Sequence, residues 1–119
     1  MSKNLDIIML FDFYRNILTE KQIEVVDLYY NEDLSLAEIS EHLNITRQGV
    51  RDNIKRAEGI LIEMEDKLHL VEKHNTIMDA IGGISSEITE LEENEAIATL
   101  PSVVEHISNI KDLLSEIVD

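Results

Sequence analysis

Apolar residues recur every three or four positions along most of the chain, a spacing that predicts helices. The first stripe of this kind comprises Leu10, Phe11, Tyr14, Ile17 and Leu18. Strict alternation of apolar and polar residues, which is typical of a half-buried strand, is missing from the sequence. We therefore predict an all-α protein.

Residues suited to helix capping mark the starts of the next three predicted helices. Thr19 and Ser35 each begin a capping box, in which a hydroxyl residue is followed three positions later by Gln or Glu. Asn44 suits the left-handed position that closes a short helix. Thr46 can cap the following helix, since its hydroxyl can accept a hydrogen bond from a first-turn amide.

The helix that starts at Thr46 is predicted to be long. Its apolar residues are separated alternately by four and three positions, as in a heptad seam: Val50, Ile54, Ala57, Leu61, Met64, Leu68 and Val71. Continuous to about Ile81, where Gly82 and Gly83 are expected to break it, the helix would measure roughly 50 Å. A 60-residue domain is not expected to bury so long a seam without the C-terminal segment or a second chain.

The C-terminal part is predicted to be helical as well. Ser85 or Ser86 is expected to cap one helix, and Pro101 to precede a final helix. Apolar residues of that final helix again follow a spacing of four and three: Val103, Ile107, Ile110, Leu114 and Ile117. We divide the chain into a helix-turn-helix domain, residues 1–60, and a helical extension, residues 61–119, in which Leu61, Met64, Leu68 and Val71 are predicted to form a dimerisation seam.

Composition narrows the class of protein. The 119 residues contain 10 Lys and Arg against 25 Asp and Glu, a formal charge of −15, and residues 61–119 carry most of the excess acid. Cys is absent, which excludes disulfides, thiolate zinc ligands and cysteine nucleophiles. No apolar run approaches the ~18 residues of a membrane span, and the first ten residues lack the basic start of a secretory signal. We expect a cytoplasmic protein without a membrane segment.

Residues 46–59 form a local exception to the acidic composition. Four cations, Arg47, Arg51, Lys55 and Arg56, stand there against Asp52 and Glu58. Two interpretations remain open on charge alone. The segment is either an ordinary solvated helix face or a positive patch that contacts phosphate groups selectively.

Two short helices joined by a tight turn, residues 35–43 and 46–59, fit a helix-turn-helix motif. At about 100° per residue, Val50 and Ile54 point in one direction and pin the second helix to the core. The N-terminal end of that helix, with Thr46, Arg47 and Gln48, is predicted to reach base edges in a major groove. The phosphate-binding residues are then expected to be Arg51, Lys55 and Arg56. Asp52 lies on the same face and opposes this hypothesis, and an ordinary helical hairpin is the alternative.

The stretch from Leu18 to Leu61 resembles region 4 of bacterial sigma factors. More closely, the chain resembles the YlxM family, small helix-turn-helix proteins whose genes accompany those of the signal recognition particle. The residues that carry this resemblance are Leu28–Tyr30, Asp33–Ile39 and Thr46–Glu58, with Glu65, Lys67 and Leu68 beyond them. The resemblance implies a sigma-region-4-like domain with a long helix and a C-terminal helical extension, a homodimer, and a regulatory role in or beside the signal recognition particle pathway.

Other candidate chemistry is weak. Glu65 and His69 lie four residues apart on a predicted helix and could share a metal ion, but no third ligand is suggested, so a solvated pair is the better interpretation. Asn75 either fixes the register of the seam or lies where the helix has already left it. No nucleophile or phosphate-loop motif appears. We therefore expect no enzymatic activity, no cofactor and no metal ion.

Two functional hypotheses follow. In the first, the protein is a nucleic-acid-binding regulator that works as a homodimer. Duplex DNA is favoured over RNA, because side chains read the deep, narrow major groove of A-form RNA poorly. In the second, it is a protein-interaction module that binds a component of the signal recognition particle and does not bind DNA.

Overall fold

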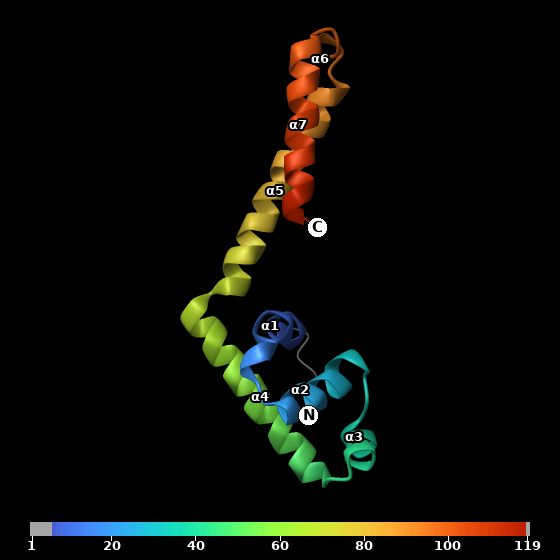
Figure 1. Cartoon of the computed structure of the whole chain (residues 1–119), viewed down its shortest axis with the longest axis vertical. Helices are drawn as coiled ribbons and strands as arrows, with labels where there is room; N and C mark the ends of the chain where they lie inside the picture. Colours follow the sequence, from blue (N-terminus) through green and yellow to red (C-terminus); the bar gives the residue numbers. More distant parts are fainter. Residues whose placement is uncertain (1–5, 119) are drawn as a thin grey trace. The chain divides into compact units, whose positions relative to one another are not determined.

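The computed structural model describes residues 6–118 (Figure 1). It divides into two compact units, Met1–Val71 and Glu72–Asp119, here called unit 1 and unit 2. The described residues form helices and contain no strand, which confirms the all-α prediction.

Unit 1 is built around one long helix. Its elements are α1 (Asp6–Tyr14), a 3-10 turn (Arg15–Ile17), α2 (Glu20–Val26), a π-helical turn (Asp27–Asn31), α3 (Leu36–Leu43) and α4 (Arg47–Leu68). Figure 1 shows α4 with α1, α2 and α3 gathered along it, and each of the three packs on α4. The largest fully buried side chains are Phe11, Ile7, Ile39, Ile54, Leu61, Val25, Val26 and Val50.

Both predicted capping boxes are present. At the start of α2, the Thr19 hydroxyl oxygen accepts from the Gln22 amide at 3.2 Å, and the Gln22 side chain accepts from the Thr19 amide at 2.9 Å. Ser35 and Glu38 make the same reciprocal pair at the start of α3, with both distances 3.1 Å. Each box satisfies two backbone donors that the first turn of a helix cannot use.

The heptad seam of α4 is buried inside unit 1. Val50, Ile54, Ala57 and Leu61 are all 0 % exposed. We predicted that a 60-residue domain could not bury the seam of this helix. That prediction was wrong for the part of the seam up to Leu61. The reason is that α1 packs along the distal half of α4, as the hydrogen bond from the Tyr14 hydroxyl to Glu65 Oε1, 2.6 Å long, shows.

The predicted continuous helix from Thr46 to Ile81 was also wrong. In the structure α4 ends at Leu68, and His69 adopts a left-handed conformation with φ of 55°. Three hydrogen bonds hold this break: Tyr14 to Glu65, the Leu70 amide to the Tyr14 hydroxyl at 3.2 Å, and the Val71 amide to Glu65 Oε1 at 3.0 Å. They satisfy amides in the first turn of the next helix, which offsets the cost of a left-handed residue.

That next helix, α5 (Leu70–Glu93), passes through Gly82 and Gly83 without a break. The predicted interruption was wrong because glycine weakens a helix by only about 1 kcal/mol and still donates its backbone hydrogen bond. Ser85 and Ser86 consequently lie inside α5 and cap nothing. The Ser85 carbonyl instead accepts from the Thr89 hydroxyl at 3.0 Å.

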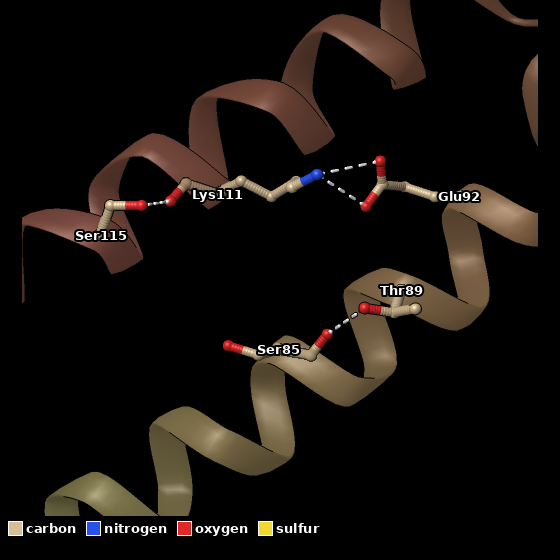
Figure 2. Close-up of polar contacts among 5 residues, drawn as sticks. All are labelled: Ser85, Thr89, Glu92, Lys111 and Ser115. Carbon is tan, nitrogen blue, oxygen red and sulfur yellow. Dashed lines mark hydrogen bonds and ion pairs between the residues drawn. The ribbon is translucent and has the colours of Figure 1, made fainter. Parts of the chain in front are cut away.

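Unit 2 is a helical hairpin. It contains α5 from Glu72 onward, the short α6 (Glu95–Ala98) and α7 (Pro101–Val118), which begins at Pro101 as predicted. Figure 2 shows α5 and α7 side by side, joined by the ion pair between Lys111 and Glu92 at 3.1 Å. The buried residues of this hairpin are Ile81, Ile88 and Ile107.

Candidate nucleic-acid interface

The turn between α3 and α4 is fixed by its own polar groups. Asn44 is left-handed with φ of 56°, as its position at the end of α3 predicted. The Ser40 hydroxyl donates to the Ile45 carbonyl at 2.5 Å, and the Ile45 amide donates to the Ser40 carbonyl at 3.2 Å. The start of α4 is therefore held firmly against the end of α3.

Thr46 caps α4 as predicted, because its hydroxyl oxygen accepts from the Gly49 amide at 2.9 Å. A Cβ atom at position 49 would lie 3.2 Å from that same oxygen. Glycine at position 49 thus leaves room for the capping hydroxyl. The Thr46 hydroxyl keeps its proton available for an acceptor outside the chain.

The two sides of α4 differ completely in exposure. Val50 and Ile54 are fully buried against the rest of unit 1, as the motif predicted. All six predicted nucleic-acid-binding residues are exposed: Thr46, Arg47, Gln48, Arg51, Lys55 and Arg56. The fold thus brings them together on α4 and its N-cap, where none of the residues 6–118 covers them.

The cations of this face are available to an anion. Arg47, Arg51 and Arg56 make no ion pair or hydrogen bond with any residue of the described chain 6–118. Lys55 interacts electrostatically with Glu58, one turn further along α4. Three guanidinium groups therefore keep their full hydrogen-bonding capacity for phosphate or base acceptors.

Asp52 is the acidic exception on this face, and the structure gives it a partner. Its Oδ1 accepts from Gln48 Nε2 at 2.9 Å. The bond occupies a side chain that was predicted to contact bases. Gln48 can form two hydrogen bonds with adenine only if its hydrogen bond to Asp52 breaks or if the two side chains move together.

Glu58 lies at the edge of the exposed face and is half-buried. Burial raises the pKa of its carboxyl, while the nearby Tyr30 side chain and the charge of Lys55 act in the opposite direction. Because the rise prevails, the fold favours the neutral form of Glu58 more than water does.

Glu65 and His69 were considered as a metal-binding pair, and the structure gives Glu65 a different role. Its carboxylate holds Tyr14 and the start of α5. Burial and the bond to Glu65 raise the pKa of Tyr14. Within residues 6–118 no cluster of three His, Asp or Glu side chains is placed to hold a metal ion. Sequence reasoning missed this role because Tyr14 lies 51 residues away from Glu65.

The four residues of the predicted dimerisation seam differ in exposure. Leu61 and Val71 are buried within unit 1, Met64 is half-buried and Leu68 is exposed. The packing of unit 1 therefore already uses Leu61 and Val71, and Leu68 has the most surface left for a second chain. Asn75 lies on α5, beyond the break at His69, so it does not continue the seam of α4.

None of the helices within residues 6–118 combines the length and the apolar character that crossing a membrane requires.

Comparison with known proteins identifies the family. Residues 1–100 match the family model UPF0122, described as "Putative helix-turn-helix protein, YlxM / p13 like". A UPF0122 protein of Clostridium kluyveri is 42 % identical over 109 residues, which cover 92 % of this chain and 98 % of the relative. One from Thermoanaerobacter sp. is 44 % identical over 100 residues, 84 % of this chain and 86 % of the relative. The chain belongs to the UPF0122 family, as the resemblance to YlxM proteins predicted.

Proposed function

We propose that this UPF0122 protein is a nucleic-acid-binding regulator that places the exposed side of α4 in the major groove of duplex DNA. The observation that carries the proposal is the contrast between the two sides of α4. One side is completely buried, while the other presents Arg47, Arg51 and Arg56 without ion-pair partners among the described residues. An exposed cation without an ion-pair partner can contact a phosphate group without first breaking another ion pair.

The position of each residue on α4 suggests its role. Thr46, Arg47 and Gln48 form the N-terminal end of the helix, which in helix-turn-helix proteins contacts base edges. Arg47 suits the O6 and N7 acceptors of guanine. Arg51, Lys55 and Arg56 lie further along and suit phosphate groups on either side of the groove.

Binding by two chains fits this surface better than binding by one. Four cations make few phosphate contacts, and a single reading helix gives little affinity. A homodimer would present two such helices to two half-sites. We therefore include the homodimer in the proposal, with a regulatory, non-enzymatic role.

The test is a titration of labelled duplex DNA against the full chain at several salt concentrations. We expect Arg51→Ala and Lys55→Ala each to weaken binding to all sequences and to lower the salt dependence by about one counterion. Arg47→Ala should cost about 1–3 kcal/mol at one base position only. Lys67→Ala is the matched control, because Lys67 lies on the same helix but pairs with Glu63 at 3.0 Å.

Duplex binding that is absent even at low salt would eliminate the proposal. Loss of affinity in Lys67→Ala equal to that in Arg51→Ala would show that net charge, and not this face, is responsible. A structured RNA that binds more tightly than the duplex would move the function to RNA.

The acidic composition of unit 2 favours a second candidate, a module that binds a protein. Residues 72–119 contain two Lys and no Arg against eleven Asp and Glu, which suits a basic partner. The resemblance to YlxM proteins makes the protein of the signal recognition particle the first partner to test. If the protein of the signal recognition particle binds the chain and no DNA duplex does, the second candidate replaces the first.

A further inference from the structure

A left-handed residue separates the two longest helices of the described residues at a point where the sequence contains no helix breaker. His69, with φ of 55° and ψ of 32°, lies between α4, of 22 residues, and α5, of 24 residues. Residues 60–81 contain neither Gly nor Pro. A Cβ atom makes the left-handed conformation costly, so the local sequence favours a continuous helix. Contacts beyond the local backbone therefore hold this break.

Two side chains supply the acceptors that the break takes from the backbone. In a continuous helix, the amides of Leu70 and Val71 would donate to the carbonyl oxygens four residues earlier. In the structure the Leu70 amide donates to the Tyr14 hydroxyl at 3.2 Å, and the Val71 amide donates to Glu65 Oε1 at 3.0 Å. The Tyr14 hydroxyl donates in turn to the same Oε1 at 2.6 Å. We call Tyr14 and Glu65 the latch.

The latch links the break to the core of unit 1. Tyr14 comes from α1 and is 4 % exposed, and Val71, the second residue of α5, is 8 % exposed in the same cluster of buried side chains. The bonds of the latch and the packing of Val71 favour the broken helix. A continuous helix would instead relieve the strain at His69 and return both amides to backbone acceptors. Because both arrangements satisfy the same two amides, a small number of contacts decides between them.

We propose that the joint at His69 is a conformational switch with two states: the broken helix, which the latch holds, and one continuous helix made from α4 and α5. The latch opens when the Tyr14 hydroxyl leaves Glu65 and the Leu70 amide. In the continuous state, the exposed cations of α4 and the first helix of unit 2 belong to the same helix. Any ligand that binds one of the two states more tightly shifts the population toward it. The switch does not depend on nucleic-acid binding.

The two states differ in a distance within one chain. Gly59 on α4 and Gly83 on α5 are exposed, and a Cβ atom at either position would meet no other part of the chain within 4 Å beyond its own helix backbone. The chain has no cysteine, so Gly59→Cys and Gly83→Cys together carry a pair of spin labels. A continuous helix places the two Cα atoms about 36 Å apart, and a break between them can only shorten this distance. Dilution with unlabelled chain ensures that pulsed electron paramagnetic resonance reports distances within one molecule.

Removing the hydroxyl of Tyr14 tests the latch. We expect the labelled chain to show mainly a distance below about 36 Å. Tyr14→Phe should raise the ratio of continuous to broken helix at least about tenfold, because it removes two hydrogen bonds of the break and leaves the ring in the core. The backbone chemical shifts of His69 should move toward helical values at the same time. Tyr30→Phe is the matched control, since it removes another buried tyrosine hydroxyl from the same core, and we expect it to change neither measurement.

Residue 69 provides a test that leaves the core untouched, because His69 is exposed. Glycine adopts the left-handed conformation without the penalty of a Cβ atom, while alanine is the best helix former. His69→Ala should therefore move the population toward the continuous helix, and His69→Gly toward the broken one. In combination with Tyr14→Phe, the alanine variant should show mainly the distance of about 36 Å, and the glycine variant should restore the shorter one.

Three outcomes would overturn the proposal. The first is that Tyr14→Phe combined with His69→Ala keeps only the shorter distance. The second is an equal change in Tyr14→Phe and Tyr30→Phe, which would show general loosening of unit 1 and not release of a latch. The third is a labelled chain with native Tyr14 and His69 that already shows mainly the distance of about 36 Å. If Tyr14→Phe fails to fold, His69→Ala and His69→Gly decide alone, because identical distances in these two variants contradict the switch.

Discussion

At the scale of single residues, α4 carries both the cations proposed to bind DNA and an anion that opposes them. Asp52 is exposed and held by Gln48. Its neighbouring cations on α4 are Lys55 and Arg56, three and four residues further along, and its charge reduces the positive potential that a phosphate meets there. The balance between attraction and repulsion on this helix can therefore be tested by one substitution.

We expect Asp52→Asn to raise the affinity for duplex DNA about three- to tenfold at low salt, because it removes a repulsive charge and leaves an amide that can still accept from Gln48. The measurement is a fluorescence anisotropy titration. Asp66→Asn serves as control, since Asp66 is also exposed on α4 but lies four turns from Asp52. Unchanged or weaker binding by Asp52→Asn would show that Asp52 does not meet the nucleic acid, or that it reads a base.

Glu58 gives a prediction about pH. Its pKa is raised above the ordinary value of 4.5, so between that value and the raised one the folded state binds more protons than the unfolded state. The free energy of unfolding therefore falls as pH rises through this range. Glu58→Gln, which is neutral at every pH, should be more stable than the wild type at pH 7, and the difference should shrink below pH 4.5. Thermal unfolding at both pH values checks the sign, and a destabilised variant at pH 7 contradicts it.

At the scale of helices, local sequence predicted the beginnings of the elements well. The capping residues Thr19, Ser35 and Thr46 and the left-handed Asn44 all lie where their side chains indicated. These features depend on hydrogen bonds between residues only a few positions apart. For the same reason, the exposed side of α4 could be predicted from the periodicity of Val50 and Ile54.

Breaks that depend on distant contacts could not be predicted in this way. Neither Gly nor Pro marks the break at His69, which is held by Tyr14 from another helix. Conversely, Gly82 and Gly83 suggested a break that the flanking helix-forming residues prevent.

The two serines at predicted caps provide a stability test. Ser35→Ala should lower the free energy of unfolding of unit 1 by about 1 kcal/mol, because it removes the acceptor for the Glu38 amide. Ser86→Ala should leave the free energy of unfolding of unit 1 unchanged, since Ser86 lies inside α5 in unit 2. Near-ultraviolet circular dichroism reports unit 1 specifically, because the chain has no Trp and all three Tyr lie there. Equal loss in both variants would contradict the assignment of the cap.

At the scale of the whole molecule, charge is distributed unequally between the two units. Unit 1 contains eight Lys and Arg against fourteen Asp and Glu, and unit 2 contains two against eleven. Half of the basic residues of unit 1 belong to α4 residues 47–56. A polyanion is therefore repelled by most of the protein and attracted by one helix face, which favours a single mode of approach over loose binding.

This distribution limits how strongly salt can act on DNA binding. Each phosphate neutralised contributes about −0.9 to the slope of log K against log salt. The four cations Arg47, Arg51, Lys55 and Arg56 therefore allow a slope no steeper than about −3.6 per bound chain. Arg15 is not expected to add to it, because its guanidinium lies over the ring of Phe11, 4.8 Å from the centroid.

We expect a slope between about −2 and −3.6 per chain when duplex affinity is measured from about 50 to 200 mM salt, with protein and duplex concentrations that also define the stoichiometry. A slope near zero would mean that phosphate contacts do not hold the complex. A much steeper slope per chain would mean that cations outside α4 take part, and the face defined by Arg47, Arg51, Lys55 and Arg56 would then be only part of the interface. The Arg51→Ala and Lys55→Ala double variant distinguishes these cases, because it should lower the slope by about two counterions only if both side chains contact phosphate.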